Sequence, residues 1–149
     1  MAVNPIPEGY HTITPFLVVK DARKLIEFMK QAFDAEVKHI SENDGVVMHG
    51  EVKIGNSMLM LAEENVNAPG SPTGIYLYVT DTDAMYKKAV DAGATSIMEP
   101  ADQFYGDRNA GVKDFAGNSW WIGTHIEDVS AEEIKRRMTE MNEKRKAQE

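Results

Sequence analysis

The chain has 149 residues, of which 42% are hydrophobic and 27% are charged, and its 16 basic and 24 acidic side chains give a formal net charge of −8. This composition suits one soluble domain, or two small halves that share a core. The negative charge argues against nucleic acid as a main partner, because phosphates require a concentrated Lys and Arg surface. The absence of cysteine excludes disulfides and thiolate chemistry.

No stretch of the sequence is long and apolar enough to cross a membrane, so no membrane partner is expected. The first residues, MAVNPIPEGYHTITP, have neither a basic start nor an apolar run and do not form a secretory signal. We therefore expect a cytoplasmic protein.

The first half of the chain predicts one strand, one helix and three further strands. The strand TPFLVV is followed by Asp21, whose side chain is suited to accept a free backbone N–H at a helix start. Leu25, Ile26, Met29 and Phe33 then recur at the spacing of one helix face. The three strands that follow are EVKHIS, VVMHGEVKI and SMLMLAE.

The second half repeats this order. The strand GIYLYV precedes Asp81, a helix with Met85, Ala89 and Val90 on one face, and the strands TSIMEP, NAGVKD and SWWIGTH. Leu17 and Leu77 coincide when the chain is compared with itself at a shift of 60 residues, and so do several later positions. Matched order and spacing over such a length indicate an internal duplication.

The triplet GNS occurs once in each half, in KIGNSM and FAGNSW. Gly and Asn adopt turn conformations at little cost, so both copies are predicted to join the last two strands of a unit. We expect a single domain over residues 1–127, with units at about 10–64 and 74–126. The segment 64–74 is the predicted linker between them.

Residues 128–149 predict a terminal helix. Ser130 and Glu133 have the spacing of a capping box, and Ile134, Met138 and Met141 form a narrow apolar stripe. The stripe either packs on the sheet of the same chain or contacts a second subunit.

Several stretches carry a family resemblance: IPEGYHTITPFLVVKDARKLIEFMKQAFDAE, MHGEVKIGNSMLML, QFYGDRNAGVKDFAGNSWWIGTH and EDVSAEE. They resemble the PhnB-like branch of the vicinal oxygen chelate superfamily, which contains glyoxalases, bleomycin resistance proteins and ring-cleaving dioxygenases. One departure is DFAG at residues 114–117, where that branch usually has Asp-Pro-Phe-Gly. The resemblance implies an α+β fold of tandem βαβββ units that form a cup of curved mixed sheet, covered outside by helices, and it implies a homodimer.

Metal-using members of that superfamily place one ligand on the first strand and one on the last strand of each unit. The matching positions here are Thr14, Met60, Ile75 and Trp121. None of these side chains is a good ligand for a divalent cation that prefers nitrogen and carboxylate donors. We therefore expect neither a metal site nor another cofactor.

His49 and Glu51 are the candidates for catalysis. The apolar parity of their strand is expected to turn Met48, Val52 and Ile54 toward the helices, so His49 and Glu51 face the cup or solvent. They form either an acid/base pair or part of a sheet face that is partly exposed to solvent. His125 and Glu127, which follow the last strand, are expected to be capping or surface residues.

The cup implied by the resemblance has an apolar and aromatic lining. Either it is a packed core, or it binds a small, partly apolar or planar molecule. Arg108 either clamps an acidic ligand group or holds its own loop through a carboxylate. The candidate ligand-binding residues are Phe16, Met58, Met60, Ile75, Leu77, Tyr105, Arg108 and Trp121.

Three functions are compatible with these features. The first is a metal-free protein that binds a small molecule, as bleomycin resistance proteins do. The second is a lyase, isomerase or dioxygenase of the same superfamily that is metal-independent or has a relocated metal and uses His49 and Glu51. The third is a subunit or interaction module with the terminal helix as its contact.

Overall fold

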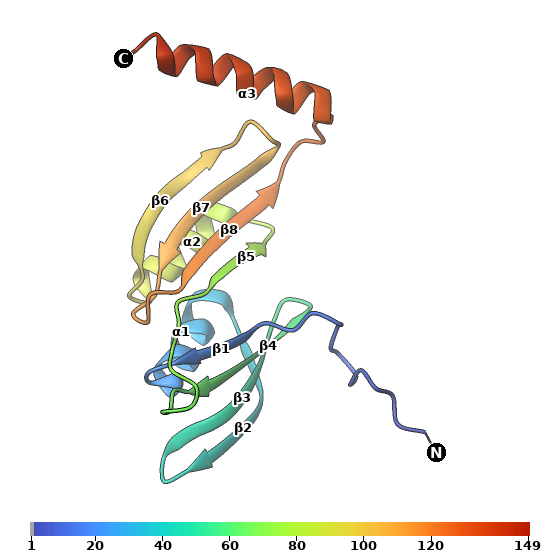
Figure 1. Cartoon of the computed structure of the whole chain (residues 1–149), viewed down its shortest axis with the longest axis vertical. Coiled ribbons are helices and arrows are strands. Elements are labelled where there is room, and N and C mark those ends of the chain that lie inside the picture. Colours follow the sequence, from blue (N-terminus) through green and yellow to red (C-terminus); the bar gives the residue numbers. More distant parts are fainter. Residues whose placement is uncertain (1) are drawn as a thin grey trace.

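A computed structural model of the chain describes residues 2–149 and contains two four-stranded sheets and three helices within that range (Figure 1). The first unit comprises β1 (Phe16–Val19), α1 (Ala22–Phe33), β2 (Glu36–Asn43), β3 (Val46–Ile54) and β4 (Ser57–Glu63). The second comprises β5 (Gly74–Tyr78), α2 (Thr82–Asp91), β6 (Thr95–Asp102), β7 (Asp107–Lys113) and β8 (Ser119–His125). The chain ends with α3 (Ala131–Lys146).

The two units have the same strand order, as a duplication predicts. It is β1-β4-β3-β2 in the first sheet and β5-β8-β7-β6 in the second. The first strand of each unit pairs in parallel with the last, and the other pairs are antiparallel. The register places Phe16 beside Met60 and Tyr76 beside Trp121. The α+β fold of paired βαβββ units with a terminal helix is therefore confirmed.

Both unit helices begin at the predicted aspartates. The Asp21 side chain accepts a hydrogen bond from the Lys24 backbone N–H at 3.1 Å, and Asp81 does the same for Ala84 at 3.0 Å. At the start of α1 the Glu63 carboxylate also accepts two backbone N–H groups, each at 2.8 Å. These carboxylates satisfy free backbone donors and complement the positive end of the helix dipole.

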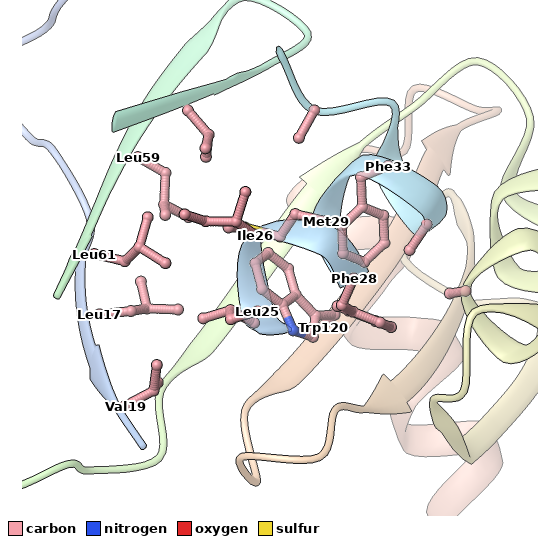
Figure 2. Packing of buried hydrophobic residues seen from close by; sticks show 14 of the residues in the cluster. Leu17, Val19, Leu25, Ile26, Phe28, Met29, Phe33, Leu59, Leu61 and Trp120 are labelled. Carbon is pink, nitrogen blue, oxygen red and sulfur yellow. The ribbon is translucent and has the colours of Figure 1, made fainter. Parts of the chain in front are cut away.

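The two units share one core, which is centred on α1 (Figure 2). Leu25, Met29 and Phe33 are buried against the first sheet and against Trp120 of β8. The rings of Phe33 and Trp120 lie 4.8 Å apart between centroids. Because the largest buried side chain comes from the second unit and packs on the helix of the first, neither unit completes its core alone.

The prediction that Met48 faces the helices is wrong. Ser41 pairs with His49 and Glu42 pairs with Val47, so β3 carries one extra residue at this point. Such a bulge reverses the face of the residues before it. As a result Val47 is buried in the core and Met48 is exposed.

The two GNS triplets lie in turns between the last two strands, as predicted, but their surroundings differ. Asn56 is exposed and accepts only a local bond from the Ser57 hydroxyl, at 3.1 Å. Asn118 is buried, donates from Nδ2 to Asp114 Oδ2 at 2.9 Å and accepts the Thr73 backbone N–H at 3.0 Å. The second triplet therefore joins the linker to the turn, and its neighbour Asp114 also accepts the Trp120 indole N–H at 2.8 Å.

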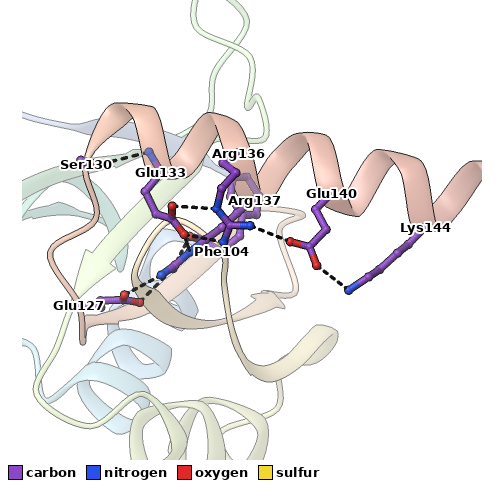
Figure 3. Close-up of polar contacts among 8 residues, drawn as sticks. All are labelled: Phe104, Glu127, Ser130, Glu133, Arg136, Arg137, Glu140 and Lys144. Atoms are coloured by element: carbon purple, nitrogen blue, oxygen red, sulfur yellow. Dashed lines mark hydrogen bonds and ion pairs between the residues drawn. The ribbon is translucent and has the colours of Figure 1, made fainter.

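Polar contacts of its first turns hold the terminal helix α3 to the rest of the chain (Figure 3). The Ser130 hydroxyl caps it by accepting the Glu133 backbone N–H at 3.1 Å. Arg137 donates to both carboxylate oxygens of Glu127, at 2.8 and 3.0 Å, and to the Phe104 carbonyl at 3.1 Å. No residue of α3 is buried, and its apolar stripe is half exposed. No helix within residues 2–149 could span a bilayer.

Candidate functional site

The helices α1 and α2 lie behind the sheets in the view of Figure 1, which leaves the opposite sheet faces open. We call these the open faces. Phe16 and Met60 lie on the open face of the first sheet, since Leu17 and Leu61 beside them are buried against the helices. In the second sheet Trp121 lies on the open face, since its neighbours Trp120 and Ile122 are buried in the core. The predicted lining residues Phe16, Met58, Met60 and Trp121 thus share the open side.

On the first sheet, His49 and Glu51 lie on the open face as expected. His49 Nε2 is 3.8 Å from Glu51 Oε1, and the imidazole stacks on Phe16 with ring centroids 6.4 Å apart. The Tyr10 hydroxyl donates a hydrogen bond to Glu51. Burial, followed by this bond and the charge of Glu51, raises the pKa of Tyr10 to about 12. The hydroxyl therefore stays protonated and holds the carboxylate.

A larger polar group occupies the open face of the second sheet. Asp107, only 4% exposed, accepts hydrogen bonds at Oδ2 from the Tyr76 hydroxyl at 2.9 Å and the Tyr78 hydroxyl at 3.1 Å. Its Oδ1 lies 2.9 Å from His125 Nδ1. Asn109 and Tyr105 adjoin this group, and we call the set the Asp107 cluster: Tyr76, Tyr78, Tyr105, Asp107, Asn109 and His125.

Asp107 and His125 stabilise each other's charged forms. Burial opposes ionisation of Asp107, but hydrogen bonds from His125, Tyr76 and Tyr78 outweigh it and lower the pKa of the carboxyl. Hydrogen bonds to Asp128 and then to Asp107 raise the pKa of His125 above 6.5. The second ring nitrogen, Nε2, lies 2.8 Å from Asp128 Oδ1. With both nitrogens bound to carboxylates, His125 bridges Asp107 and Asp128, and protonation of its ring is favoured.

Tyr76 and Tyr78 of the cluster remain neutral. Burial raises the pKa of Tyr76 to about 12, and its bond to Asp107 acts in the same direction. The pKa of Tyr78 is also raised, first by its hydrogen bond to Asp107. Both hydroxyls are therefore fixed as donors to the carboxylate, and their rings are tilted by 53° with centroids 5.0 Å apart.

Asn109 has a buried polar atom without a partner in the part of the chain that the structure describes. It is 4% exposed, and its Nδ2 donates to the Tyr105 hydroxyl at 2.6 Å and approaches the Tyr76 hydroxyl at 3.4 Å. Its Oδ1 is buried and accepts no hydrogen bond from residues 2–149. Exchanging the amide nitrogen and oxygen would transfer the deficit to the nitrogen, so either orientation leaves one buried polar atom unpaired.

Three predicted lining residues face the other way. Ile75 and Leu77 pack against the core on the helix side, because the strand that pairs with β8 turns Tyr76 and Tyr78 to the open face. The expected placement was wrong by one residue. Arg108 also points to the helix side, where it binds Asp83 of α2 bidentately at 2.7 and 2.8 Å and Asp102 at 3.0 Å. These bonds favour the alternative in which Arg108 holds its loop.

The metal positions of the superfamily do not fit a divalent cation in this chain. The strand register pairs Phe16 with Met60 and Tyr76 with Trp121, so the counterpart of Thr14 is Gly74 and not Ile75. Thr14 and Gly74 have no side-chain nitrogen or carboxylate. Met60 and Trp121, on the last strands, offer a thioether and an indole, which do not bind such a metal. Within residues 2–149 no three His, Asp or Glu side chains form a group suited to a metal.

A separate cavity of about 310 Å³ lies where the units meet. It is lined by the end of β1, the first turn of α1, the linker residues Gly70 to Pro72, and Phe115 with Ala116. The last two belong to the DFAG turn, which differs from the Asp-Pro-Phe-Gly of the PhnB-like branch. Lys24 lies over the Phe115 ring, 4.5 Å from its centroid. None of the predicted site residues contributes to this cavity.

The sequence did not point to Tyr76, Tyr78, Asp107, Asn109 or His125 as site residues. A signal was available, because the shift of 60 residues that aligns Leu17 with Leu77 also aligns Phe16 with Tyr76. His125 was expected to be a capping or surface residue, and its side chain is exposed. The expectation did not include its contact with Asp107, which it makes as the final residue of β8.

The structure thus has paired βαβββ units, each with an open sheet face that carries aromatic side chains. Residues 10–122 match the model of the Glyoxalase/Bleomycin resistance protein/Dioxygenase superfamily. A protein of Mycobacterium bovis is 34% identical over 151 aligned residues, covering 93% of this chain and 97% of that protein. The chain therefore belongs to the Glyoxalase/Bleomycin resistance protein/Dioxygenase superfamily.

Solved structures show the same fold at lower identity. TioX from a Micromonospora species is 17% identical with a TM-score of 0.68, covering 78% of this chain and 99% of that one. TnmS3, an antibiotic binding protein from a Streptomyces species, is 18% identical with a TM-score of 0.60, covering 77% and 97%.

Proposed function

We propose that this protein, as a PhnB-like member of its superfamily, binds a small, partly apolar or planar molecule on its open sheet faces without a metal. The single observation that carries the proposal is the set of residues at the metal-ligand positions of the superfamily, Thr14, Met60, Gly74 and Trp121. None of them is a nitrogen or carboxylate ligand, and exposed aromatic rings lie beside them. A site without a cation must hold its ligand by shape, stacking and hydrogen bonds.

Two aromatic rings of the second sheet lie flat across neighbouring strands, which supports stacking. A side-chain carbon on Gly111 of β7 would lie 2.6 Å from Trp121 Cζ3, so the indole covers that backbone. In the same way, a side-chain carbon on Gly123 of β8 would collide with the Tyr76 ring, so this ring covers the backbone of Gly123. Rings that lie along the sheet present their faces outward, and a planar molecule stacks on such faces with little reorganisation.

The proposed assembly is a homodimer. Phe16 is 52% exposed and Tyr78 is 69% exposed, and both belong to the open faces. A second copy of the chain that brings its own open face over them would cover these rings and enclose a hollow. The antibiotic binding of TnmS3, a protein of the same fold, agrees with a ligand in such a place.

The test is a thermal-shift screen of planar metabolites and drugs, followed by tryptophan fluorescence. Trp120 is fully buried and Trp121 is half-buried on the open face, so a ligand there should quench mainly Trp121. We expect Trp121→Ala to abolish both the shift and the quenching. Phe115→Ala, a change at the separate cavity, is the matched control and should leave both intact. Shifts that survive Trp121→Ala would contradict the proposal.

The second candidate is proton-transfer catalysis by His49 and Glu51, in the manner of a lyase or isomerase. Their shared face and their 3.8 Å separation support it. If any turnover is found, His49→Ala should reduce it at least tenfold, because a positioned acid or base contributes 10²–10⁴-fold, roughly. Full activity in that variant would eliminate this candidate.

A further inference from the structure

We propose that the ligand of the second sheet is a planar organic cation that carries an N–H donor, held by the Asp107 cluster. The inference rests on the proposed binding function and adds a chemical class to it. Three features of the cluster support it independently: its charge, its electron-rich rings and its unsatisfied acceptor.

The first feature is the sign of the charge. Asp107 of the cluster and the adjacent, exposed Asp128 are two carboxylates joined by a single imidazole, His125. The cluster together with Asp128 therefore keeps a net negative charge even when His125 is protonated. The whole chain is also negative, at −8. An anionic ligand would be repelled at this face, whereas a cation would be attracted.

The second feature is the pair of tilted tyrosines. Their hydroxyls donate to the same oxygen of Asp107, which draws negative charge toward the phenol groups. Tyr76 and Tyr78 therefore present electron-rich faces above a buried carboxylate. A cation within about 6 Å of such a ring face is attracted by the ring quadrupole, and a planar one also stacks.

The third feature is the amide oxygen of Asn109. A buried acceptor without a donor is costly, and native proteins rarely leave one. Tyr105, whose hydroxyl covers Asn109, belongs to the turn between β6 and β7 and is half-buried. The proposal requires the Tyr105 side chain to move when the ligand binds, so that an N–H group of the ligand supplies the donor that Asn109 Oδ1 lacks.

Three matched probes separate these features: 9-aminoacridine is a planar cation with N–H groups, 10-methylacridinium is a planar cation without them, and acridine is neutral at mildly alkaline pH. By calorimetry at low salt, we expect 9-aminoacridine to bind most tightly and acridine at least tenfold more weakly. Tyr78→Leu, at an exposed position that folding tolerates, should weaken both cations about two- to fivefold. Asn109→Leu should remove the preference for 9-aminoacridine over 10-methylacridinium.

The outcomes distinguish this inference from the function on which it rests. If acridine binds as tightly as the cations and Trp121→Ala abolishes that binding, the binding function stands and the cation inference is wrong. If Tyr78→Leu leaves the affinity of both cations unchanged and Asn109→Leu keeps the preference for 9-aminoacridine, the Asp107 cluster is not the site. If none of the three probes binds, the cation inference is wrong, and the thermal-shift screen with Trp121→Ala decides the binding function separately.

Discussion

His125 of β8 and Asp107 of β7 face each other across one antiparallel pair, with 2.9 Å between Nδ1 and Oδ1. Sequence spacing gives no hint of this relation, because 18 residues separate them. The bond links the last strand to the buried carboxylate that also orients Tyr76 and Tyr78.

The pair predicts a pH-dependent stability. His125 has a raised pKa in the folded protein, so its stabilisation is complete below its ordinary pKa of 6.5 and is lost as pH rises through the folded value. Asp107 has a lowered pKa, so its contribution is present above 3.8 and is lost as pH falls through the folded value. Both stabilising contributions are therefore present between pH 3.8 and pH 6.5.

The measurement is urea unfolding of the native chain and of His125→Gln from weakly acidic to alkaline pH. We expect the difference in unfolding free energy to be largest at weakly acidic pH and to shrink as the solution becomes alkaline. His39→Gln is the control, because His39 is exposed and its ring bonds to the neutral Ser41 hydroxyl, at 2.8 Å. A difference that does not vary with pH would show that the bridge is not charged.

The duplicated triplet supplies a matched pair of variants. Asn118→Ala leaves the Thr73 backbone N–H without its acceptor and removes the bond to Asp114, so it should lower the unfolding free energy by about 1–3 kcal/mol. Asn56→Ala removes one exposed local bond and should change it by less than about 0.5 kcal/mol. Equal effects in chemical unfolding would mean that the two turns have the same role.

The attachment of α3 depends on Arg137. Arg137→Ala removes the bidentate bond to Glu127 and the bond to the Phe104 carbonyl, so limited proteolysis should cleave α3 faster. Arg136→Ala is the control, because Arg136 pairs only with Glu133 and Glu140 of the same helix. If the two variants are cleaved at the same rate, something other than Arg137 holds the helix.

The state of assembly is testable by sedimentation. We expect a dimer for the native chain, and a shift toward monomer when Phe16→Asp and Tyr78→Asp place charges on the open faces. Met138→Asp, on the apolar stripe of α3, should leave the dimer intact. A monomeric native chain, or dissociation by Met138→Asp alone, would mean that the open faces do not form the interface.

Most of the fold was predictable, because the duplication repeats local signals that agree with one another. Aspartate caps, helix-spaced apolar residues and Gly-Asn turns each specify an element without reference to the rest of the chain. The bulge at Met48 was not predictable, since strand alternation contains no signal for an inserted residue.

The site was less predictable than the fold. The sequence predicts Ile75 and Leu77 on the open face because both sides of their short strand are apolar or aromatic. The pattern therefore does not say which side faces the helices, and a register error of one residue exchanges the two faces. The Asp107 cluster depends on side chains from three strands and a turn. Only the sheet register brings these together, so no spacing in the sequence identifies them.

The most direct measurement of the central claim is calorimetric titration of a ligand from the screen into protein that has been dialysed against EDTA. We predict the same affinity and melting temperature as for protein supplied with zinc or nickel, and no stoichiometric metal in the purified chain. Binding that appears only after the metal is restored, or a bound ion near Met60 and Trp121, would contradict the claim that this site holds its ligand without one.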